Sequence, residues 1–430
     1  MWSMNPVKLG TRLVLVGILM LLSMSCSQNG GTKKITLDFW AFGAEGDKVR
    51  DFVTRFEAEN PGVHVVAQNI PWTAAHEKLL TAYAGNSLPD ICQLGNTWIP
   101  EFVVLNALEI LDASVDSSMT IAPDSYFPGI WETNRIAENL YGIPWYVDTR
   151  VLFYRRDLLS KIGWERPPET WAEMLEISRL LVKGGHSKYG IILPLNEWSL
   201  PIILGMQQGS EILREQAGFG DFAGSEFLQG LKIYDQFFQE GLAPKGMTEV
   251  NNVYQGFQEA TFAMYISGPW NIGEMKRRLP AHMQDDWDTA PLPAIRAEDY
   301  PGLSLPGGSS LVVFRSSEHK DLAWDWIEYL SRPDVQSEFY VQTGDLPARL
   351  ESWTSMELSV KRPTAAFFRQ LESVKKTPQV PEWEQIAMKL QQYLEYVVFG
   401  KWTAKEAMDL LDQDVNKILE KRRWLQSRDS

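Results

Sequence analysis

The first apolar segments of the chain alternate between strand-like and helix-like patterns. Residues 35–40 (ITLDFW) predict a short buried strand, and residues 47–60 repeat apolar side chains at helical spacing before an Asn-Pro-Gly stop. Two more strands at 63–68 and 90–94, with a helix at 74–84 between them, continue the alternation. Strand, helix, strand, helix, strand at this spacing is typical of right-handed βαβ units, so the pattern predicts a parallel sheet.

A second block repeats this organisation. Two of its helices are expected to begin with a capping box, formed by Thr170 with Glu173 and by Thr403 with Glu406. The pattern therefore predicts an α/β fold in two units, followed by about 65 residues of mainly helical pattern. The expected strands cover 141–147, 151–154, 189–193, 262–266 and 309–314, and the expected helices cover 170–182, 225–240, 321–330 and a segment opened by Gly268-Pro269-Trp270.

The N-terminus has the pattern of a secretory signal. Two positive residues precede ten uncharged residues (13–22), and a short segment of small residues leads to Cys26. The apolar run is shorter than the roughly 20 residues that cross a bilayer, and a buried N-terminal helix is the alternative interpretation. A Cys after a small residue resembles the lipobox of bacterial lipoproteins, although Ser23 stands where that box usually has Leu. We therefore expect a signal peptide over 1–25, a lipid on Cys26 and a flexible tether over 26–34.

The net charge restricts the classes of binding partner, and the cysteine count restricts the possible disulfides. The formal charge is −14, and removal of the two positive charges within residues 1–25 brings it to −16. An acidic chain repels phosphate backbones, which argues against nucleic acid as a partner. Cys26 and Cys92 are the two cysteines, so a lipid on Cys26 leaves no disulfide and the fold must rest on its hydrophobic core.

The 17 tryptophans are the unusual feature of the composition. A buried tryptophan needs a partner for its N–H, which limits its use in cores. Many tryptophans combined with many carboxyl and amide groups suit a ligand with apolar faces and hydroxyl rims, such as a sugar. The five histidines show no metal-ligand spacing, and we expect no metal and no cofactor.

Eight short motifs follow one another in an order and spacing that span residues 35–425. Together they resemble the extracellular solute-binding proteins of carbohydrate ABC importers, the family of maltose-binding protein. The motifs are Phe39-Trp40, FEAENPGV at 56–63, AGNSLPDI at 84–91, Gly142-Ile143-Pro144 followed by Asp148 and YRRDLL at 154–159, PETW at 168–171, AMY at 263–265 with GPW at 268–270, Pro306-Gly307-Gly308, and the helix at 321–330.

The resemblance implies a periplasmic-binding-protein-like type II fold, with two α/β lobes and a ligand cleft between them. It further implies a monomer without enzymatic activity. Such a protein binds a mono- or oligosaccharide on the extracytoplasmic face of a bacterial membrane and delivers it to the permease subunits of an ABC transporter. Lobe 1 is expected to comprise 35–147 plus 296–345, and lobe 2 148–295 plus 346–425, with crossings near 147–150, 290–296 and 345–350.

Aromatic ligand candidates lie where α/β sheets place their ligands, at strand ends and in the segments that follow. Trp270 is the strongest of them, because Gly268 and Pro269 fix a sharp turn and the family stacks this Trp on the sugar. Trp40 ends the first strand, and its alternative role is to cover the sheet. The other aromatic candidates are Trp98, Trp145 and Trp198.

Polar candidates are groups that hydrogen-bond sugar hydroxyls. Asp148 falls where maltose-binding protein has a sugar-binding glutamate, and its alternative role is an ion pair with Arg150, itself a candidate contact. Gly307 and Gly308 would let a ligand approach the backbone, or would simply form a flexible turn. The remaining polar candidates are Glu45, Asn96, Asn196, Glu197 and Asn271.

Three other functions stay open at this point. A glycoside hydrolase needs two carboxylates that face one bond, and nothing in the spacing of Glu45, Asp148 and Glu197 requires that arrangement. A binding protein for a polyamine, a phosphodiester or a metal chelate is the second alternative, because an amine also favours aromatic rings and carboxylates. Adhesion to surface glycans without a transporter is the third.

Overall fold

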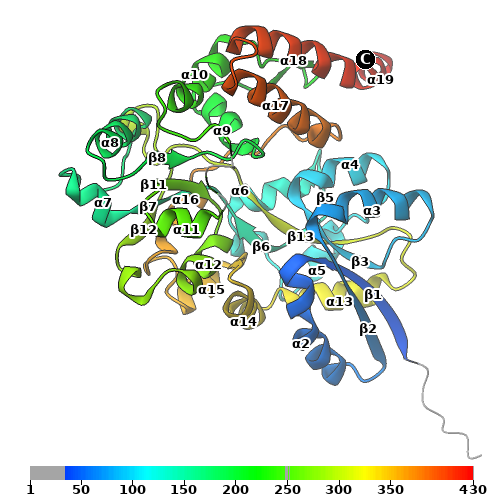
Figure 1. The fold of residues 1–430 in the computed structure, drawn as a ribbon. Coiled ribbons are helices and arrows are strands. Elements are labelled where there is room, and N and C mark those ends of the chain that lie inside the picture. Colours follow the sequence, from blue (N-terminus) through cyan, green and yellow to red (C-terminus); the bar gives the residue numbers. More distant parts are fainter. Residues whose placement is uncertain (1–33, 247–249, 251, 430) are drawn as a thin grey trace, which may run out of the picture.

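The computed structural model describes residues 34–246, 250 and 252–429, which form two α/β lobes side by side (Figure 1). The predicted signal peptide, Cys26 and the predicted tether up to residue 33 lie outside the described residues. Within the part that the structure describes, no helix combines the length and the apolar character needed to cross a membrane.

Lobe 1 is built on a mixed six-stranded sheet in the order β14-β6-β13-β3-β1-β2. The strands β1, β2 and β3 pair in parallel, as the alternating pattern predicts. The other half of the sheet is antiparallel, because later segments of the chain return to it as β6, β13 and β14. The strands are β1 (Ile35–Phe42), β2 (Val63–Ile70), β3 (Ile91–Gly95), β6 (Ile143–Asp148), β13 (Gly307–Val313) and β14 (Leu346–Pro347).

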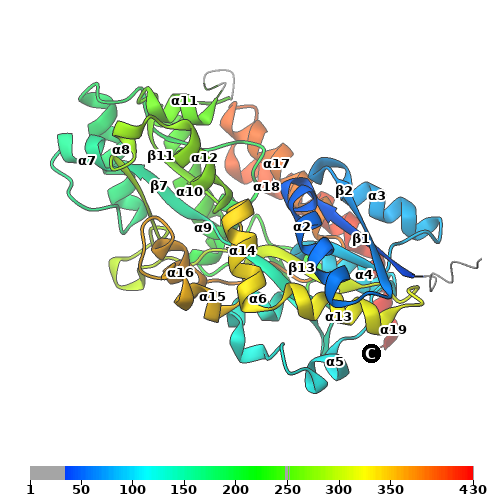
Figure 2. The same cartoon turned by 90° about the horizontal axis from the view of Figure 1, so that it is seen from below.

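Amphipathic helices pack on this sheet. Phe56 of α2 lies against Trp326 of α13, with ring centroids 4.9 Å apart. The helix α14 packs on α2 and lies in the middle of the molecule, between the two lobes, in Figure 2. The helices of this layer are α2 (Gly43–Glu59), α3 (Trp72–Ala84), α4 (Ile99–Val104), α13 (Lys320–Leu330) and α14 (Pro333–Thr343).

Lobe 2 has a four-stranded sheet in the order β12-β7-β11-β8, in which β11 is parallel to β8 and antiparallel to β7. Thr403 with Glu406 forms the predicted capping box. The box predicted at Thr170 is only half formed: the Thr170 hydroxyl accepts a hydrogen bond from the N–H of Glu173, but the Glu173 carboxylate accepts from the N–H of Glu169, one residue before the cap. The C-terminal helices α17 and α18 pack on α10 and lie at the top of Figure 1. The elements are β7 (Val151–Arg155), β8 (Tyr189–Ile192), β11 (Phe262–Ser267), β12 (Trp287–Ala290), α8 (Trp171–Lys183), α10 (Ser225–Gln239), α12 (Trp270–Arg278), α17 (Trp383–Val398) and α18 (Ala404–Ile418).

The third crossing between the lobes lies later in the chain than predicted. Residues 345–350 stay with lobe 1, because β14 pairs with β6 and α15 (Leu350–Ser355) packs on α14 and β14. The chain reaches lobe 2 with α16 (Ala365–Leu371), which packs on β7 and β12. A two-residue strand such as β14 is too short to leave a pattern in the sequence, which explains the error.

Shorter elements connect these layers. They are α5 (Asp112–Ser117), α6 (Pro128–Trp131), β4 (Arg135–Ile136), β5 (Asn139–Leu140), α7 (Arg156–Lys161), α9 (Ser199–Gln207), β9 (Leu213–Arg214), β10 (Phe219–Gly220), α11 (Val253–Gln258) and α19 (Glu420–Asp429), with the 3-10 turns η1 (Asn96–Trp98), η2 (Pro123–Ser125), η3 (Glu132–Asn134), η5 (Ala281–Met283) and η6 (Ala297–Asp299).

Candidate functional site

A cavity of about 920 Å³ lies between the two lobes, and we call it the interlobe cavity. Lobe 1 lines it with residues at the ends of β1, β3 and β6 and at the start of β13, and lobe 2 with the segments that follow β8 and β11. Strand ends are where α/β sheets place ligands, as expected. Ten of the predicted site residues line this cavity: Glu45, Asn96, Trp98, Asp148, Arg150, Glu197, Trp198, Trp270, Gly307 and Gly308.

Glu45 is a buried carboxyl group that a polar network holds in place. It stands in the first turn of α2, directly after β1. Its Oε1 accepts a hydrogen bond from the Tyr146 hydroxyl at 2.7 Å and one from Gln93 Nε2 at 3.5 Å. Burial raises the pKa of the Glu45 carboxyl, and the hydrogen bond from Tyr146 opposes that rise. The network therefore presents a fixed carboxyl group at the lobe 1 wall.

Asp345 is a second carboxyl group in the same wall. It stands just before β14, and its backbone N–H donates to the Thr343 hydroxyl at 3.0 Å. Burial, followed by the neighbouring charges of Glu45 and Asp148, raises the pKa of Asp345 to about 8. At neutral pH this carboxyl group therefore keeps its proton and can donate a hydrogen bond as well as accept one.

Arg150 joins the polar groups of both lobes. Its Nη1 lies 3.1 Å from Asp148 Oδ1, its Nη2 lies 3.5 Å from Glu197 Oε2, and its Cζ lies 4.9 Å from the centroid of the Trp270 ring. The alternative role of Asp148, an ion pair with Arg150, is thus present alongside its position in the cavity. Burial raises the pKa of Asp148, and the charge of Arg150 counteracts it.

Trp270 begins α12 and is 41% exposed, which is unusual for an indole between two lobes. A Cβ at Gly268 would lie 2.0 Å from a ring atom of Trp270, so only glycine lets the indole fold back over the turn. One side of the ring carries the Arg150 guanidinium, and the cavity borders the ring as well. The arrangement leaves aromatic surface free for a ligand.

Gly307 and Gly308 start β13 where it pairs with β6. A Cβ at Gly307 would lie 2.2 Å from Asp148 Oδ1, and one at Gly308 would lie 2.3 Å from the Tyr146 carbonyl oxygen. Gly308 also has a φ of +120°, which favours glycine. Gly307 therefore makes room for the Asp148 side chain at the cavity wall, and Gly308 makes room for the backbone of β6.

The turn η1 brings lobe 1 into contact with α17 at the rim of the cavity. The Thr97 hydroxyl donates to Glu384 Oε1 at 2.7 Å, and the Trp98 ring packs edge-on against Trp72, with centroids 5.7 Å apart. Asn96 lines the cavity but is buried, and its amide is already bonded to Thr133 at 2.9 Å and to Ser310 at 3.0 Å.

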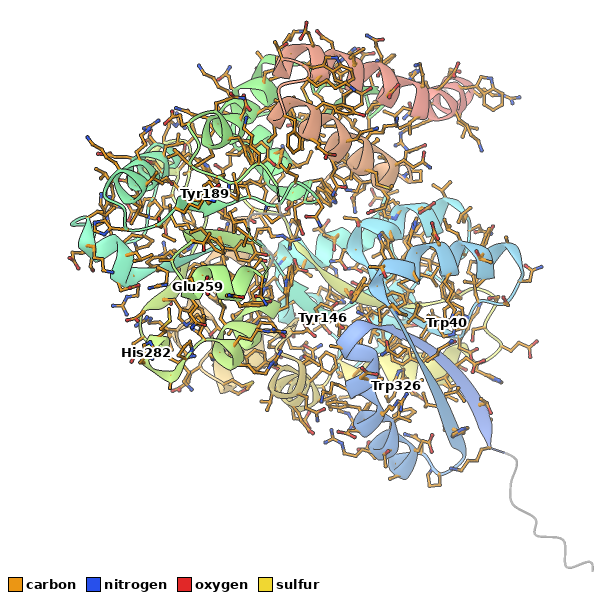
Figure 3. All side chains as sticks on the ribbon, viewed as in Figure 1. Trp40, Tyr146, Tyr189, Glu259, His282 and Trp326 are labelled. Atoms are coloured by element: carbon orange, nitrogen blue, oxygen red, sulfur yellow. The ribbon has the colours of Figure 1, made fainter. Side chains whose placement is uncertain are left out.

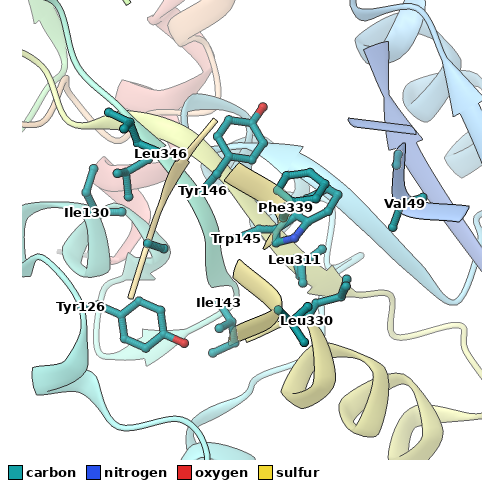
Figure 4. Packing of buried hydrophobic residues seen from close by; sticks show 14 of the residues in the cluster. Val49, Tyr126, Ile130, Ile143, Trp145, Tyr146, Leu311, Leu330, Phe339 and Leu346 are labelled. Carbon is teal, nitrogen blue, oxygen red and sulfur yellow. The ribbon is translucent and has the colours of Figure 1, made fainter. Parts of the chain in front are cut away.

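Trp40 and Trp145 lie outside the interlobe cavity, contrary to the prediction. Trp145 is 1% exposed and stacks on Phe339, with ring centroids 4.5 Å apart (Figure 4). Successive residues of a strand face opposite sides, so Tyr146 reaches the cavity while its neighbour enters the core. Trp40 has the alternative role: it packs in lobe 1 with Lys78 Nζ 4.6 Å from its ring centroid, away from Tyr146 in Figure 3.

Asn196 and Asn271 also lie outside the interlobe cavity. Asn196 borders a separate cavity of about 440 Å³ on lobe 2. Asn271 is 2% exposed and bonded inside lobe 2: its Nδ2 donates to Ser267 Oγ at 2.6 Å and its Oδ1 accepts from the Tyr254 hydroxyl at 2.9 Å. Its amide therefore anchors the start of α12 rather than facing a ligand.

Several residues that line the cavity were not predicted. Trp72 follows the end of β2, so the strand-end argument applied to all strands would have found it. Asp345 and Glu384 come from the C-terminal part of the chain and follow no long strand, so no local signal marks them. The main missed residues are Trp72, Tyr146, Tyr254, Glu274, Arg278, Thr343, Asp345, Thr377 and Glu384.

Comparisons with known proteins agree on one family. Residues 43–337 match the family model described as bacterial extracellular solute-binding protein. The structure is similar to the sugar-binding protein MalE from Xanthomonas citri, with a TM-score of 0.86 and 47% identity, covering 91% of this chain and 99% of that one. It is also similar to an ABC transporter solute-binding protein from Thermotoga lettingae bound with α-D-tagatose (TM-score 0.76, 25% identity, 89% and 99% covered). The galactooligosaccharide-binding protein of Bacillus subtilis is 24% identical, with 90% of each chain covered.

Proposed function

The chain belongs to the bacterial extracellular solute-binding proteins, and from that membership we propose that it captures a mono- or oligosaccharide between its lobes and delivers it to the permease of an ABC importer. The observation that carries the proposal is the composition of the interlobe cavity. Trp72 and Trp98 from lobe 1 and Trp198 and Trp270 from lobe 2 line it together with fixed carboxyl groups. Aromatic faces cover the C–H faces of a sugar ring, and carboxyl groups bind its hydroxyls.

The size and the polar groups of the cavity support this ligand class. Its volume of about 920 Å³ lies within the range of small-molecule sites and has room for more than one sugar ring. We assign the stacking role to Trp270 and the hydroxyl-binding roles to Asp148, Glu197 and Glu45. Arg150 forms ion pairs with two of these carboxylates, Asp148 and Glu197, and can itself donate to a hydroxyl.

Calorimetry against a panel of mono- and oligosaccharides tests the proposal. We expect a subset of the panel to bind, with a negative heat-capacity change from burial of the sugar faces. A chain that binds no sugar but binds another solute would refute the assignment. Incubation of the protein with the sugars that bind, followed by chromatography, should return them unchanged, because the proposal assigns no catalytic step to the carboxyl groups.

A second candidate ligand is an organic amine, and the charge of the cavity favours it specifically. Six carboxyl groups line the cavity, of which Asp345 is protonated at neutral pH, against the two guanidinium groups of Arg150 and Arg278. The same excess of carboxyl groups opposes a phosphodiester ligand. A polyamine series in the calorimetric panel separates the two candidates: tight binding of an amine without any binding of sugars would replace the sugar proposal.

We also propose that the protein is held at the outer face of a bacterial membrane by a lipid on Cys26. Replacement of Cys26 by Ser removes the acylated thiol, and we expect the protein to be released or to remain unprocessed. Membrane fractionation followed by mass spectrometry of the N-terminal peptide measures this. Cys92→Ser is the matched control, because that thiol is buried in lobe 1. If the Cys26 variant fractionates like the parent chain, the anchor is not this residue.

A further inference from the structure

The last helix, α19, carries positive charge on an acidic protein. It contains Lys421, Arg422, Arg423 and Arg428 against Glu420 and Asp429, whereas the whole chain has a formal charge of −14. Neither the interlobe cavity nor the ligand proposal uses this helix. Its charge therefore needs an explanation of its own.

One face of α19 packs on the β9–β10 hairpin. Arg423 Nη1 donates to the Gly218 carbonyl at 2.8 Å, and its guanidinium lies 4.6 Å from the Phe219 ring centroid. Gln426 Nε2 donates to the Gln216 carbonyl at 3.1 Å. These contacts fix the rotation of the helix about its axis, and so they decide which residues face solvent.

The opposite face is a stripe formed by Lys421, Trp424, Leu425 and Arg428, which we call the α19 stripe. All four side chains are exposed, and their spacing of three, four and seven residues places them on one side of the helix. Trp424 is 54% exposed and Leu425 is 44% exposed, and the Arg428 guanidinium lies 4.8 Å from the Trp424 ring centroid. An indole and an aliphatic side chain between two cations leave apolar area in water without any benefit to the fold.

We propose that the α19 stripe docks on an anionic phospholipid surface. Tryptophan prefers the interface between headgroups and acyl chains, and Lys and Arg are attracted to anionic headgroups. The rest of the chain is acidic and is repelled by the same surface, so the stripe orients the molecule on the membrane. We assign a lipid surface as the occupant because the stripe is a single cationic helix face. A flat anionic surface can cover such a face, and no protein partner with a matching groove or pocket is required.

The position of the stripe suits a protein held at a membrane by its N-terminal end. The start of β1 and α19 both lie along the right-hand edge of the molecule, with α19 at the upper end and the start of β1 at the lower end of that edge in Figure 1. If Cys26 carries the lipid, eight residues precede Lys34, and an extended chain of that length reaches at most about 28 Å. The tether would raise the local concentration of the stripe at the membrane, so a weak contact suffices.

Vesicle sedimentation tests the proposal on the unlipidated chain from Ser27 to Ser430, which keeps every described residue. We expect binding to phosphatidylcholine vesicles that contain phosphatidylglycerol, little binding to pure phosphatidylcholine, and loss of binding at high salt. Lys421→Gln/Arg428→Gln, and separately Trp424→Ser, should each reduce the bound fraction about fivefold or more. Lys361→Gln/Lys405→Gln changes the net charge by the same amount at exposed sites on other helices and turns, and should bind like the parent chain.

Three outcomes would overturn the proposal. The first is equal binding to both kinds of vesicle, and the second is an equal loss in the control variant, which would mean that net charge alone acts. The third is absence of vesicle binding together with a dimer, measured by light scattering, that the stripe variants convert to monomers; a second copy would then be the occupant. Sugar binding by the stripe variants is expected to be unchanged, so this test is independent of the proposed ligand.

Discussion

Replacement of Trp270 by alanine is expected to weaken sugar binding about 5- to 150-fold, because stacking and burial of the indole contribute about 1–3 kcal/mol. The expectation rests on the exposed indole of Trp270 at the start of α12. Gly268 leaves room for this ring, and the Arg150 guanidinium packs on one of its faces. Trp270→Phe should lose less, since a phenyl ring still stacks. Calorimetry with a sugar from the binding panel measures all of these affinities.

Trp40→Ala is the matched control for this experiment. It removes the same side chain from lobe 1, where Trp40 covers the sheet outside the interlobe cavity. We expect Trp40→Ala to lower the melting temperature and to leave the affinity for sugar unchanged. Trp270→Ala should leave the melting temperature unchanged and lower the affinity for sugar. If both variants bind sugar like the parent chain, the stacking role of Trp270 is wrong.

Replacement of Asp345 by asparagine is expected to stabilise the unliganded protein, and the gain should grow as the pH rises. The pKa of Asp345 is about 8 in the folded protein and near its ordinary value of 3.8 when the chain is unfolded. Between these values the unfolded chain has released a proton that the folded protein retains. Ionisation of Asp345 therefore favours unfolding, and the contribution of Asp345 to stability falls from about pH 4 to about pH 8 and then levels off.

Asparagine carries no such penalty. Each unit of pKa shift corresponds to about 1.4 kcal/mol, so even half of the shift makes Asp345→Asn more stable by roughly 3 kcal/mol at pH 8. Melting curves of both proteins from pH 4 to pH 9 should nearly coincide at the acidic end and separate steadily above it. Glu45→Gln should reduce the separation, because the charge of Glu45 contributes to the raised pKa of Asp345. A difference in melting temperature that does not depend on pH would contradict the assignment.

This cost of folding has a counterpart in the proposed function. Carboxyl groups that face a cavity and destabilise the unliganded protein commonly serve to bind a ligand. Asp345 and Glu45 lie close enough for the charge of one to act on the other. A sugar hydroxyl can donate to one of these carboxyl groups and accept from the protonated one, which would make binding weaker above pH 8.

Much of the fold was predictable because its elements depend on local patterns. Apolar periodicity predicted β1, α2, β2, α3 and β3 and their parallel pairing, and side-chain chemistry predicted the caps at Thr170 and Thr403. The rule that α/β sheets bind ligands at strand ends also helped to find ten of the residues that line the interlobe cavity, since a strand end can be recognised from the sequence beside it.

Other features depended on contacts between distant segments, and the sequence alone did not determine them. Trp145 and Tyr146 are adjacent and both apolar enough to be buried, but the order of the sheet decides which one meets Phe339 and which one meets Glu45. Asp345 enters the wall only because two residues of β14 pair with β6, about 200 residues earlier in the chain. Local composition determines whether a side chain is buried, whereas the packing of remote segments determines which groups surround it. The raised pKa of Asp345 is a result of that packing.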